Sequence, residues 1–174
     1  MTDTAYQAQE WINRTVELQE EISKLKNAVK ICESIVNNAV GKYQTTGRGK
    51  VDPIVLQQQR EDALIEYSML LDKVEKAESK LVKEELITIK VLDQMQNSLN
   101  ATLLFDRYLN RITWGEMIKT HRFGLGKSQL FRKHAEALEE LSSILNTDKI
   151  KEIPRIVENE MEQMRKKLRQ QATA

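Results

Sequence analysis

The N-terminal segment carries a repeat that is typical of a long helix packed along a partner. Small or apolar side chains recur at alternating steps of three and four, and no proline or glycine interrupts them before Gly41. The positions are Ala8, Trp11, Thr15, Leu18, Ile22, Leu25, Val29, Cys32, Val36 and Ala39. This spacing is that of a heptad seam. We therefore predict a helix over residues 8–39.

A second seam follows a turn. Residues 41–53, GKYQTTGRGKVDP, contain three glycines, two threonines and a proline, which supply turn geometry. Asp52 and Pro53 are typical of an N-cap and a first helical position. The second seam comprises Ala63, Tyr67, Leu70, Val74, Ala77 and Leu81, continued one position out of phase by Val82, Leu86 and Ile89. Two matching seams predict an antiparallel helical hairpin, a coiled-coil arm over residues 1–90.

Shorter periodic segments replace the seam after Lys90. Apolar residues between Val91 and Tyr108 have helical spacing and predict one helix that ends near Asn110. Thr113 and Glu116 then stand in capping-box order before a short helix. After the glycine-containing turn RFGLG, residues 127–145 predict a longer helix. This order is that of a helix-turn-helix, so we expect such a domain over residues 91–146.

The last segment, residues 147–174, predicts one more amphipathic helix. Val157, Met161, Met164 and Leu168 recur at steps of three and four. The stripe is short and its charge is mixed, which favours packing on the domain or pairing across a dimer over membrane binding. With only 6 glycines, 2 prolines and 5% aromatic residues in the chain, the predicted fold class is all-α.

Cations cluster locally on a nearly neutral chain. The whole sequence has 27 basic and 26 acidic residues. Between Arg107 and His134, however, the sequence has seven basic residues and one acidic residue, Glu116, which gives a net charge of +6. A segment of one sign indicates phosphate contact. At the start of the longer helix, polar residues lie off the apolar face and are of types that contact bases or phosphates. The predicted DNA-binding residues are Lys127, Ser128, Gln129, Arg132, Lys133, Arg122, Arg111 and Thr113.

Other functional classes find little support. The string GLGKS at residues 124–128 is similar to the end of a nucleotide-binding P-loop, but His121 occupies the position of the first glycine. We assign no catalytic pair, no metal site and no cofactor, and we interpret the single cysteine, Cys32, as a core residue. No run approaches the roughly 18 apolar residues that a membrane span needs, and the N-terminal residues MTDTAYQAQE lack the basic-then-apolar order that is typical of a signal peptide. We expect a cytoplasmic protein that is not an enzyme.

Two stretches of the chain carry a family resemblance. LLFDRYLNRITWGEMI and SQLFRKHAEAL resemble the region-four DNA-binding domain of bacterial sigma factors, over roughly residues 87–141. The shared positions are Arg107, Tyr108, Leu109, Thr113, Trp114, Glu116, Arg132, His134, Ala137 and Leu138. With the arm in front, the chain is similar to small phage-encoded sigma-like regulators of late, packaging and lysis genes in Gram-positive hosts. The turn RFGLGKSQL is about two residues longer than the usual turn of the family.

The resemblance implies a transcription regulator that binds promoter DNA in the cytoplasm of a bacterial host. The expected partners are double-stranded DNA, host RNA polymerase and a second copy, joined through the arm or the C-terminal helix. An alternative hypothesis is a protein-interaction module or inhibitor that grips RNA polymerase or another host protein through the arm and the altered domain. The long seam, the longer turn and the balanced charge favour this alternative, whereas the +6 segment favours DNA.

Overall fold

All secondary structure is helical in the computed structural model, which describes residues 2–41 and 53–172. This confirms the predicted all-α class. The chain divides into two compact units. We call residues Leu18–Lys80 the arm, and Met1–Glu17 together with Leu81–Ala174 the helical body.

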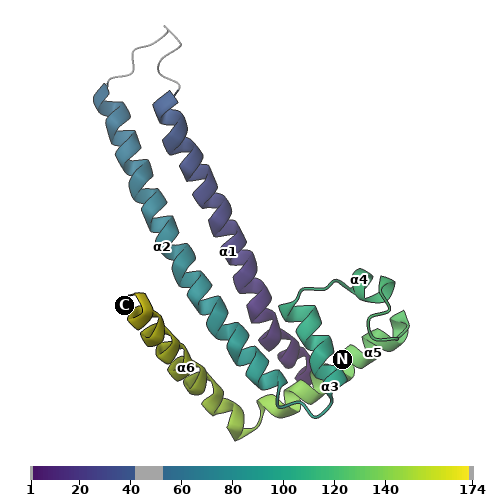
Figure 1. Cartoon of the computed structure of the whole chain (residues 1–174). Helices are drawn as coiled ribbons and strands as arrows, with labels where there is room; N and C mark the ends of the chain where they lie inside the picture. The colour runs from purple at the N-terminus through teal and green to yellow at the C-terminus, as the bar shows by residue number, and fades with distance from the viewer. Residues whose placement is uncertain (1, 42–52, 173–174) are drawn as a thin grey trace. The chain divides into compact units, whose positions relative to one another are not determined.

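The arm is a hairpin of two long helices. Helix α1 (Asp3–Gly41) and helix α2 (Pro53–Leu92) run antiparallel and side by side (Figure 1). Lys26 of α1 and Glu78 of α2 form an ion pair of 2.6 Å between Nζ and Oε1. The seam residues Leu18, Ile22, Cys32 and Val74 are buried, as the spacing predicted. Pro53 begins α2, whereas its predicted cap, Asp52, lies outside the described residues.

The helical body has a core assembled from segments far apart in the sequence. Ile12, Val91, Leu104, Leu138 and Val157 belong to one apolar cluster and are each 0% exposed. The first turns of α1 and the last turns of α2 therefore pack together with the C-terminal helices. The domain boundaries expected after residues 90 and 146 do not coincide with the boundaries of the two units. The reason is that the start of α1 and the end of α2 contribute to the same core as the C-terminal helices.

The single helix predicted over residues 91–110 is wrong. Helix α2 continues to Leu92, and after a break the chain forms α3 (Ser98–Leu104) and then η2 (Phe105–Leu109), a π-helix. Asn97 begins α3 as its N-cap, since its side chain accepts hydrogen bonds from the backbone N–H groups of Leu99 and Asn100. Val91 and Leu104 lie on either side of this break and are both buried. The apolar pattern of the sequence therefore continues across the break and does not reveal it.

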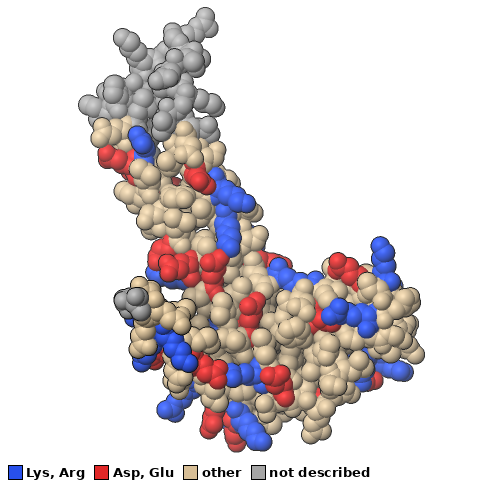
Figure 2. All heavy atoms as spheres, in the orientation of Figure 1, with Lys and Arg blue, Asp and Glu red and all other residues tan. Residues whose placement is uncertain are grey.

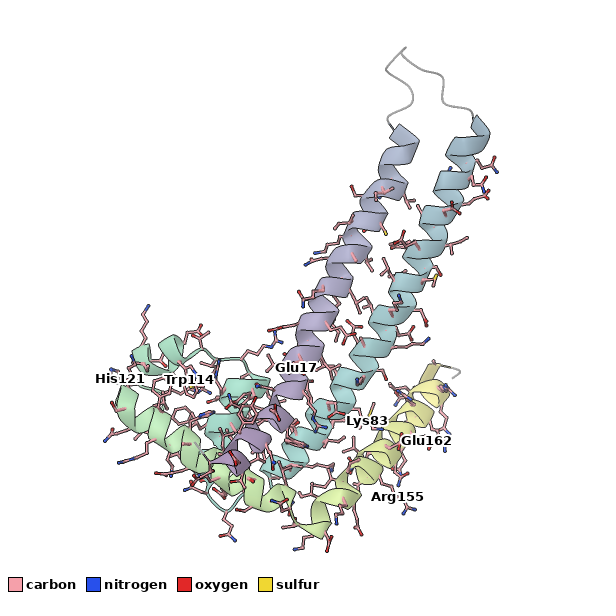
Figure 3. The ribbon with its side chains drawn as sticks, turned by 180° about the vertical axis from the view of Figure 1, so that it is seen from behind. Glu17, Lys83, Trp114, His121, Arg155 and Glu162 are labelled. Atoms are coloured by element: carbon pink, nitrogen blue, oxygen red, sulfur yellow. The ribbon has the colours of Figure 1, made fainter. Side chains whose placement is uncertain are left out.

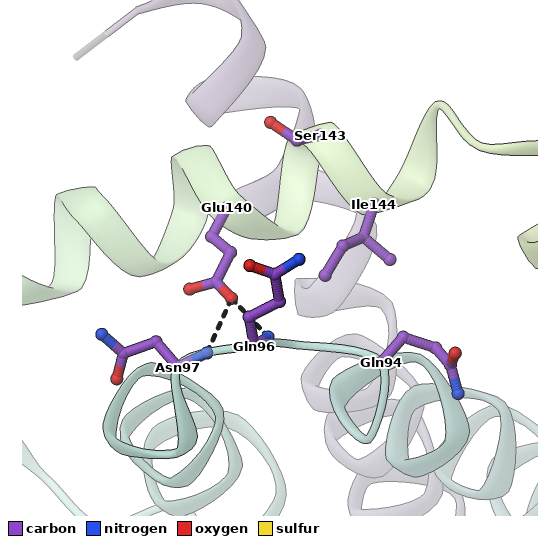
Figure 4. A pocket seen from close by; sticks show the side chains of 6 residues that line it. All are labelled: Gln94, Gln96, Asn97, Glu140, Ser143 and Ile144. Carbon is purple, nitrogen blue, oxygen red and sulfur yellow. Dashed lines mark hydrogen bonds between the residues drawn. The ribbon is translucent and has the colours of Figure 1, made fainter.

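Glu140 of α5 (Lys127–Leu145) holds the chain at this break. Its Oε1 accepts hydrogen bonds from the backbone N–H groups of Gln96, at 2.8 Å, and Asn97, at 3.0 Å (Figure 4). Its Oε2 accepts a third bond, of 2.6 Å, from Nδ2 of Asn100. The N–H groups before a helix have no intrahelical acceptor, so this carboxylate satisfies them from a neighbouring helix.

The C-terminal helix α6 (Asp148–Ala172) confirms the predicted amphipathic helix but begins before Pro154. Two ion pairs connect it to α2. Lys83, which is labelled in Figure 3, contacts Glu158 at 3.1 Å. Lys90 contacts Glu160 at 3.0 Å. Ile153 and Val157 are buried in the core of the body. Packing on the body is thus the role of the first half of this helix.

Candidate nucleic-acid interface

A short helix, a turn and the long helix α5 share a small core of their own. Helix α4 (Trp114–Lys119) and α5 contribute Met117 and Leu130 to a cluster with Leu103 of α3. The turn between them contains two residues in the left-handed region, His121 at φ +47° and Gly124 at φ +65°. Because a left-handed backbone strains most side chains, the glycine suits its position. The predicted order of a short helix, a glycine-containing turn and a longer helix is present.

A capping box begins α4, as the sequence predicted. The Thr113 hydroxyl oxygen accepts a bond of 3.2 Å from the Glu116 N–H, and the Glu116 carboxylate accepts one of 2.8 Å from the Thr113 N–H. The backbone hydrogen bond from Thr113 and the bond from its hydroxyl lower the pKa of Glu116. Thr113, predicted as a DNA contact, therefore has its hydroxyl engaged in starting the helix.

The leading end of α5 is open to solvent. Lys127, Ser128 and Gln129 are all exposed, and Oε1 of Gln129 accepts a bond of 3.0 Å from the N–H of Gly126, the N-cap. Within the described ranges, Lys127 and Ser128 make no side-chain hydrogen bond or ion pair. A helix rather than a strand precedes this turn, which differs from the surroundings of a P-loop.

One turn further along α5, the predicted cations meet a carboxylate. Lys133 Nζ lies 3.0 Å from Glu136 Oε2, and Arg132 Nε lies 3.8 Å from Glu136 Oε1. The Arg132 side chain is 76% exposed, whereas that of Lys133 is 21% exposed. The Arg132 side chain therefore extends into solvent, whereas the Lys133 side chain packs against the protein.

Arg122 and Arg111 contact other parts of the body. The Arg122 guanidinium binds the Asp106 carboxylate through Nε and through Nη2, the latter at 3.0 Å. Asp106, on the π-helix, is 1% exposed and also accepts a bond of 2.9 Å from Asn110. Arg111 Nη2 donates to the carbonyl oxygen of Val16 at 3.2 Å. Both arginines predicted as DNA contacts thus have partners inside the protein.

We expect Arg122→Ala to lower the melting temperature of the chain, because the buried Asp106 carboxylate would retain only Asn110 as a side-chain partner. Thermal unfolding followed by circular dichroism measures the change. Arg132→Ala, which removes the same side chain from an exposed position, is the control and should leave the melting temperature nearly unchanged. Equal melting temperatures for the Arg122 variant and the wild type would contradict the structural role.

Two carboxylates that the count along the sequence left out reduce the local charge. Asp106 directly precedes the counted segment and Glu136 closely follows it, and each contacts counted cations. Residues 106–136 therefore contain seven basic and three acidic side chains, which gives a net charge of +4 rather than +6. On the face seen in Figure 2, basic and acidic side chains lie beside one another over α4 and α5. Lys119 and Lys127 remain exposed without an ion pair to any other described residue.

An aromatic cluster connects the π-helix, α4 and α5. The Trp114 ring lies 5.0 Å from the Phe131 ring and 4.9 Å from the His134 ring, with the Arg107 guanidinium 5.1 Å from its centre. Figure 3 labels Trp114 and His121 in this part of the body. The position of α5 relative to α4 therefore depends on aromatic contacts as well as on the aliphatic core.

His134 is half-buried in this cluster as a neutral side chain. Its Nε2 lies 3.0 Å from the Tyr108 hydroxyl oxygen. Burial, followed by the charge of Arg107, lowers the pKa of His134 to about 4. Burial also raises the pKa of Tyr108 to about 12, against the opposing charge of Arg107. Both side chains are consequently uncharged at neutral pH.

One pocket among the described residues lies beside the break before α3. A shallow pocket of about 390 Å³ is lined by Gln94, Gln96, Asn97, Glu140, Ser143 and Ile144 (Figure 4). Its one carboxylate, Glu140, already accepts three hydrogen bonds. Within residues 2–41 and 53–172, no group of three or more His, Cys, Asp or Glu side chains is placed to hold a metal ion. None of the helices in these ranges has the length and apolar character to cross a bilayer.

Comparison with known proteins finds no matching family model, no matching curated protein and no matching solved structure.

Proposed function

We propose that the chain is a DNA-binding transcription regulator, not an enzyme, which contacts double-stranded DNA through the leading end of α5. The observation that carries the proposal is the exposure of Lys127, Ser128 and Arg132 at the start of a helix that a small core supports from behind. The resemblance to sigma region four supports the same function. It also supports an origin in a bacteriophage and action in the host cytoplasm.

The chemistry of this end suits a duplex. Free N–H groups and the positive end of the helix dipole attract phosphate, and Lys127 adds a full positive charge there. Arg132 lies more than one turn further along and can pair with a guanine edge in the major groove. Lys119, at the end of α4, supplies another exposed cation in the same helix-turn-helix. The contacts predicted for Gln129, Lys133, Arg111, Thr113 and Arg122 would require their present partners to be exchanged.

We expect Arg132→Ala to weaken DNA binding by about 1–3 kcal/mol if the arginine reads a base, and Lys127→Ala to weaken it and reduce the salt dependence. Titration with duplex fragments recovered from the phage genome, at several salt concentrations, measures both effects. Lys149→Ala, an exposed lysine of α6, is the control for the loss of one charge. Unchanged affinity in both test variants would defeat the proposal.

The second candidate is a protein partner, such as host RNA polymerase or another host protein. It is favoured by the engagement of Arg111, Arg122 and Lys133 within the body, which leaves fewer cations for phosphate. The same titration distinguishes the two functions, because phosphate contacts make log affinity fall with log salt concentration. Absence of DNA binding at low salt, together with capture of RNA polymerase by the full chain, would favour the second candidate.

A further inference from the structure

Several large apolar side chains of the arm are exposed, and three of the most exposed are Ile31, Ile35 and Met69. Ile31 is 62% exposed, Ile35 is 54% exposed and Met69 is 57% exposed. The described seam residues of the arm are also incompletely buried, since the best covered, Ile22, retains 6% exposure, whereas several core residues of the body retain none. Single exposed apolar residues are common on protein surfaces, but a group of them on one two-helix unit is typical of an interface.

These three residues lie on the same side of the hairpin. Ile31 and Ile35 each directly precede a seam residue of α1, and Met69 directly precedes the seam residue Leu70 of α2. In two antiparallel helices, positions that precede the seam project to the same side of the pair. The ion pair between Lys26 and Glu78 shows which residues of the two antiparallel helices lie at the same level. Seven residues further along α1 and seven residues back along α2, residue 33, midway between the isoleucines, lies opposite residue 71. Met69 is therefore within about one helical turn of the same level.

The charges on this side of α2 are self-complementary. The stripe comprises Asp62, Glu66, Met69, Lys73 and Lys76, at alternating steps of four and three, and all five are exposed. Acidic residues precede Met69 and basic residues follow it. Lys76 contacts Asp72 of its own helix, whereas Glu66 and Lys73 have no ion pair with another described residue.

We propose that this side of the arm binds a second copy of the chain in the antiparallel direction, with the twofold axis beside Met69. In that arrangement Lys73 faces Glu66 of the partner subunit, Lys76 faces Asp62 of the partner subunit, and each contact occurs twice. On α1, Ile31 meets Ile35 of the partner subunit across the same axis. The two hairpins together form a four-helix bundle that buries all three apolar side chains of each copy.

Charge determines the direction. In a parallel pair, Asp62 and Glu66 would face their own copies, and so would Lys73 and Lys76, and like charges opposite one another oppose association. An antiparallel pair converts every one of these contacts into an attraction. The dimer contact lies on the arm and includes none of the residues proposed to bind DNA.

The test measures the oligomeric state of the full chain by sedimentation at micromolar concentration. We expect a dimer for the wild type. Lys73→Glu and Glu66→Lys should each weaken the dimer by about tenfold or more, because each places like charges opposite one another twice. An equimolar mixture of the two single variants should recover dimers, since the acidic side chains of one variant then face the basic side chains of the other. The double variant Glu66→Lys/Lys73→Glu should dimerise like the wild type.

Matched controls locate the surface and the direction. Met69→Glu should give a monomer, whereas Leu71→Glu, on the other side of α2 and also exposed, should leave the dimer intact. With Cys32→Ser as background, a mixture of Asp62→Cys and Lys76→Cys chains should form mixed disulfides, and Asp62→Cys alone should not cross-link. Circular dichroism confirms that each variant keeps its helical content.

A monomeric wild type would overturn the proposal. So would a dimer that withstands both Met69→Glu and Lys73→Glu, or a dimer in which Asp62→Cys cross-links only to itself, which indicates parallel arms.

Discussion

Replacing Ile12 with alanine is expected to lower the free energy of unfolding of the helical body by about 3 kcal/mol, in the range of other buried large-to-small substitutions. Ile12 lies near the start of the chain, yet it is 0% exposed in the same cluster as Leu138 of α5 and Val157 of α6. The substitution would leave a cavity between helices that cannot close it without moving one another. Urea unfolding followed by circular dichroism measures the loss.

The comparison variants test how the body is assembled. Leu138→Ala should cost a similar amount, because both side chains fill one core. Leu64→Ala, at a position that is 44% exposed on the arm, should cost much less. If Ile12→Ala were as mild as Leu64→Ala, the first turns of α1 would not belong to the body, and the domain boundary expected near residue 90 would be the better description.

Acidification from pH 6.5 to pH 4 is expected to reduce stability through His134 by about 3 kcal/mol, because its pKa falls from 6.5 to about 4 on folding. The folded state holds this side chain neutral. The contribution of His134 to the free energy of unfolding is therefore complete above pH 6.5. It is lost as the pH falls toward 4, since the unfolded chain then binds a proton at this side chain and the folded chain does not. The groups that face His134 are Tyr108, Trp114 and Arg107.

Chemical unfolding at pH 7 and at pH 4.5 measures this effect against the titration of the carboxylates. His134→Asn removes the titrating ring and should lose less stability on acidification than the wild type does. His121→Asn, the same exchange at the other histidine, which is exposed, is the matched control. Identical profiles for the His134 variant and the wild type would show that this histidine is not the source of the acid sensitivity.

The sequence allows prediction of helices that have regular local patterns. The seam residues of α1 and α2, the capping box at Thr113 and the glycine turn before Lys127 each depend on neighbours in the sequence, and the structure contains all of them. Local pattern did not reveal the break before α3. That break depends on Glu140, more than forty residues away, which accepts the hydrogen bonds that the interrupted backbone would otherwise lack.

The candidate site shows the same division. The exposure of Lys127 and Arg132 follows from the helical period of α5, which the sequence displays. The partners of Arg122 and Arg111 do not follow from it, because Asp106 and Val16 are brought to them by tertiary packing. A signal for one of these contacts existed in the sequence, since Asp106 is an acidic residue at an otherwise apolar position of an amphipathic stripe. Such a residue requires a partner when it is buried.

The π-helix makes a wider turn than an α-helix does and holds one more residue in it. Asn110 donates its N–H to the carbonyl oxygen of Phe105, five residues earlier, at 3.0 Å. Within this turn, Asp106 pairs with Arg122 while Tyr108 pairs with His134. Rewinding the same residues as an α-helix, which uses one residue fewer for the same turn, would rotate everything that follows by about 100°. Both pairings could not then persist, so the contacts of Asp106 and Tyr108 with α5 and the turn before it depend on the π-helical form of this segment.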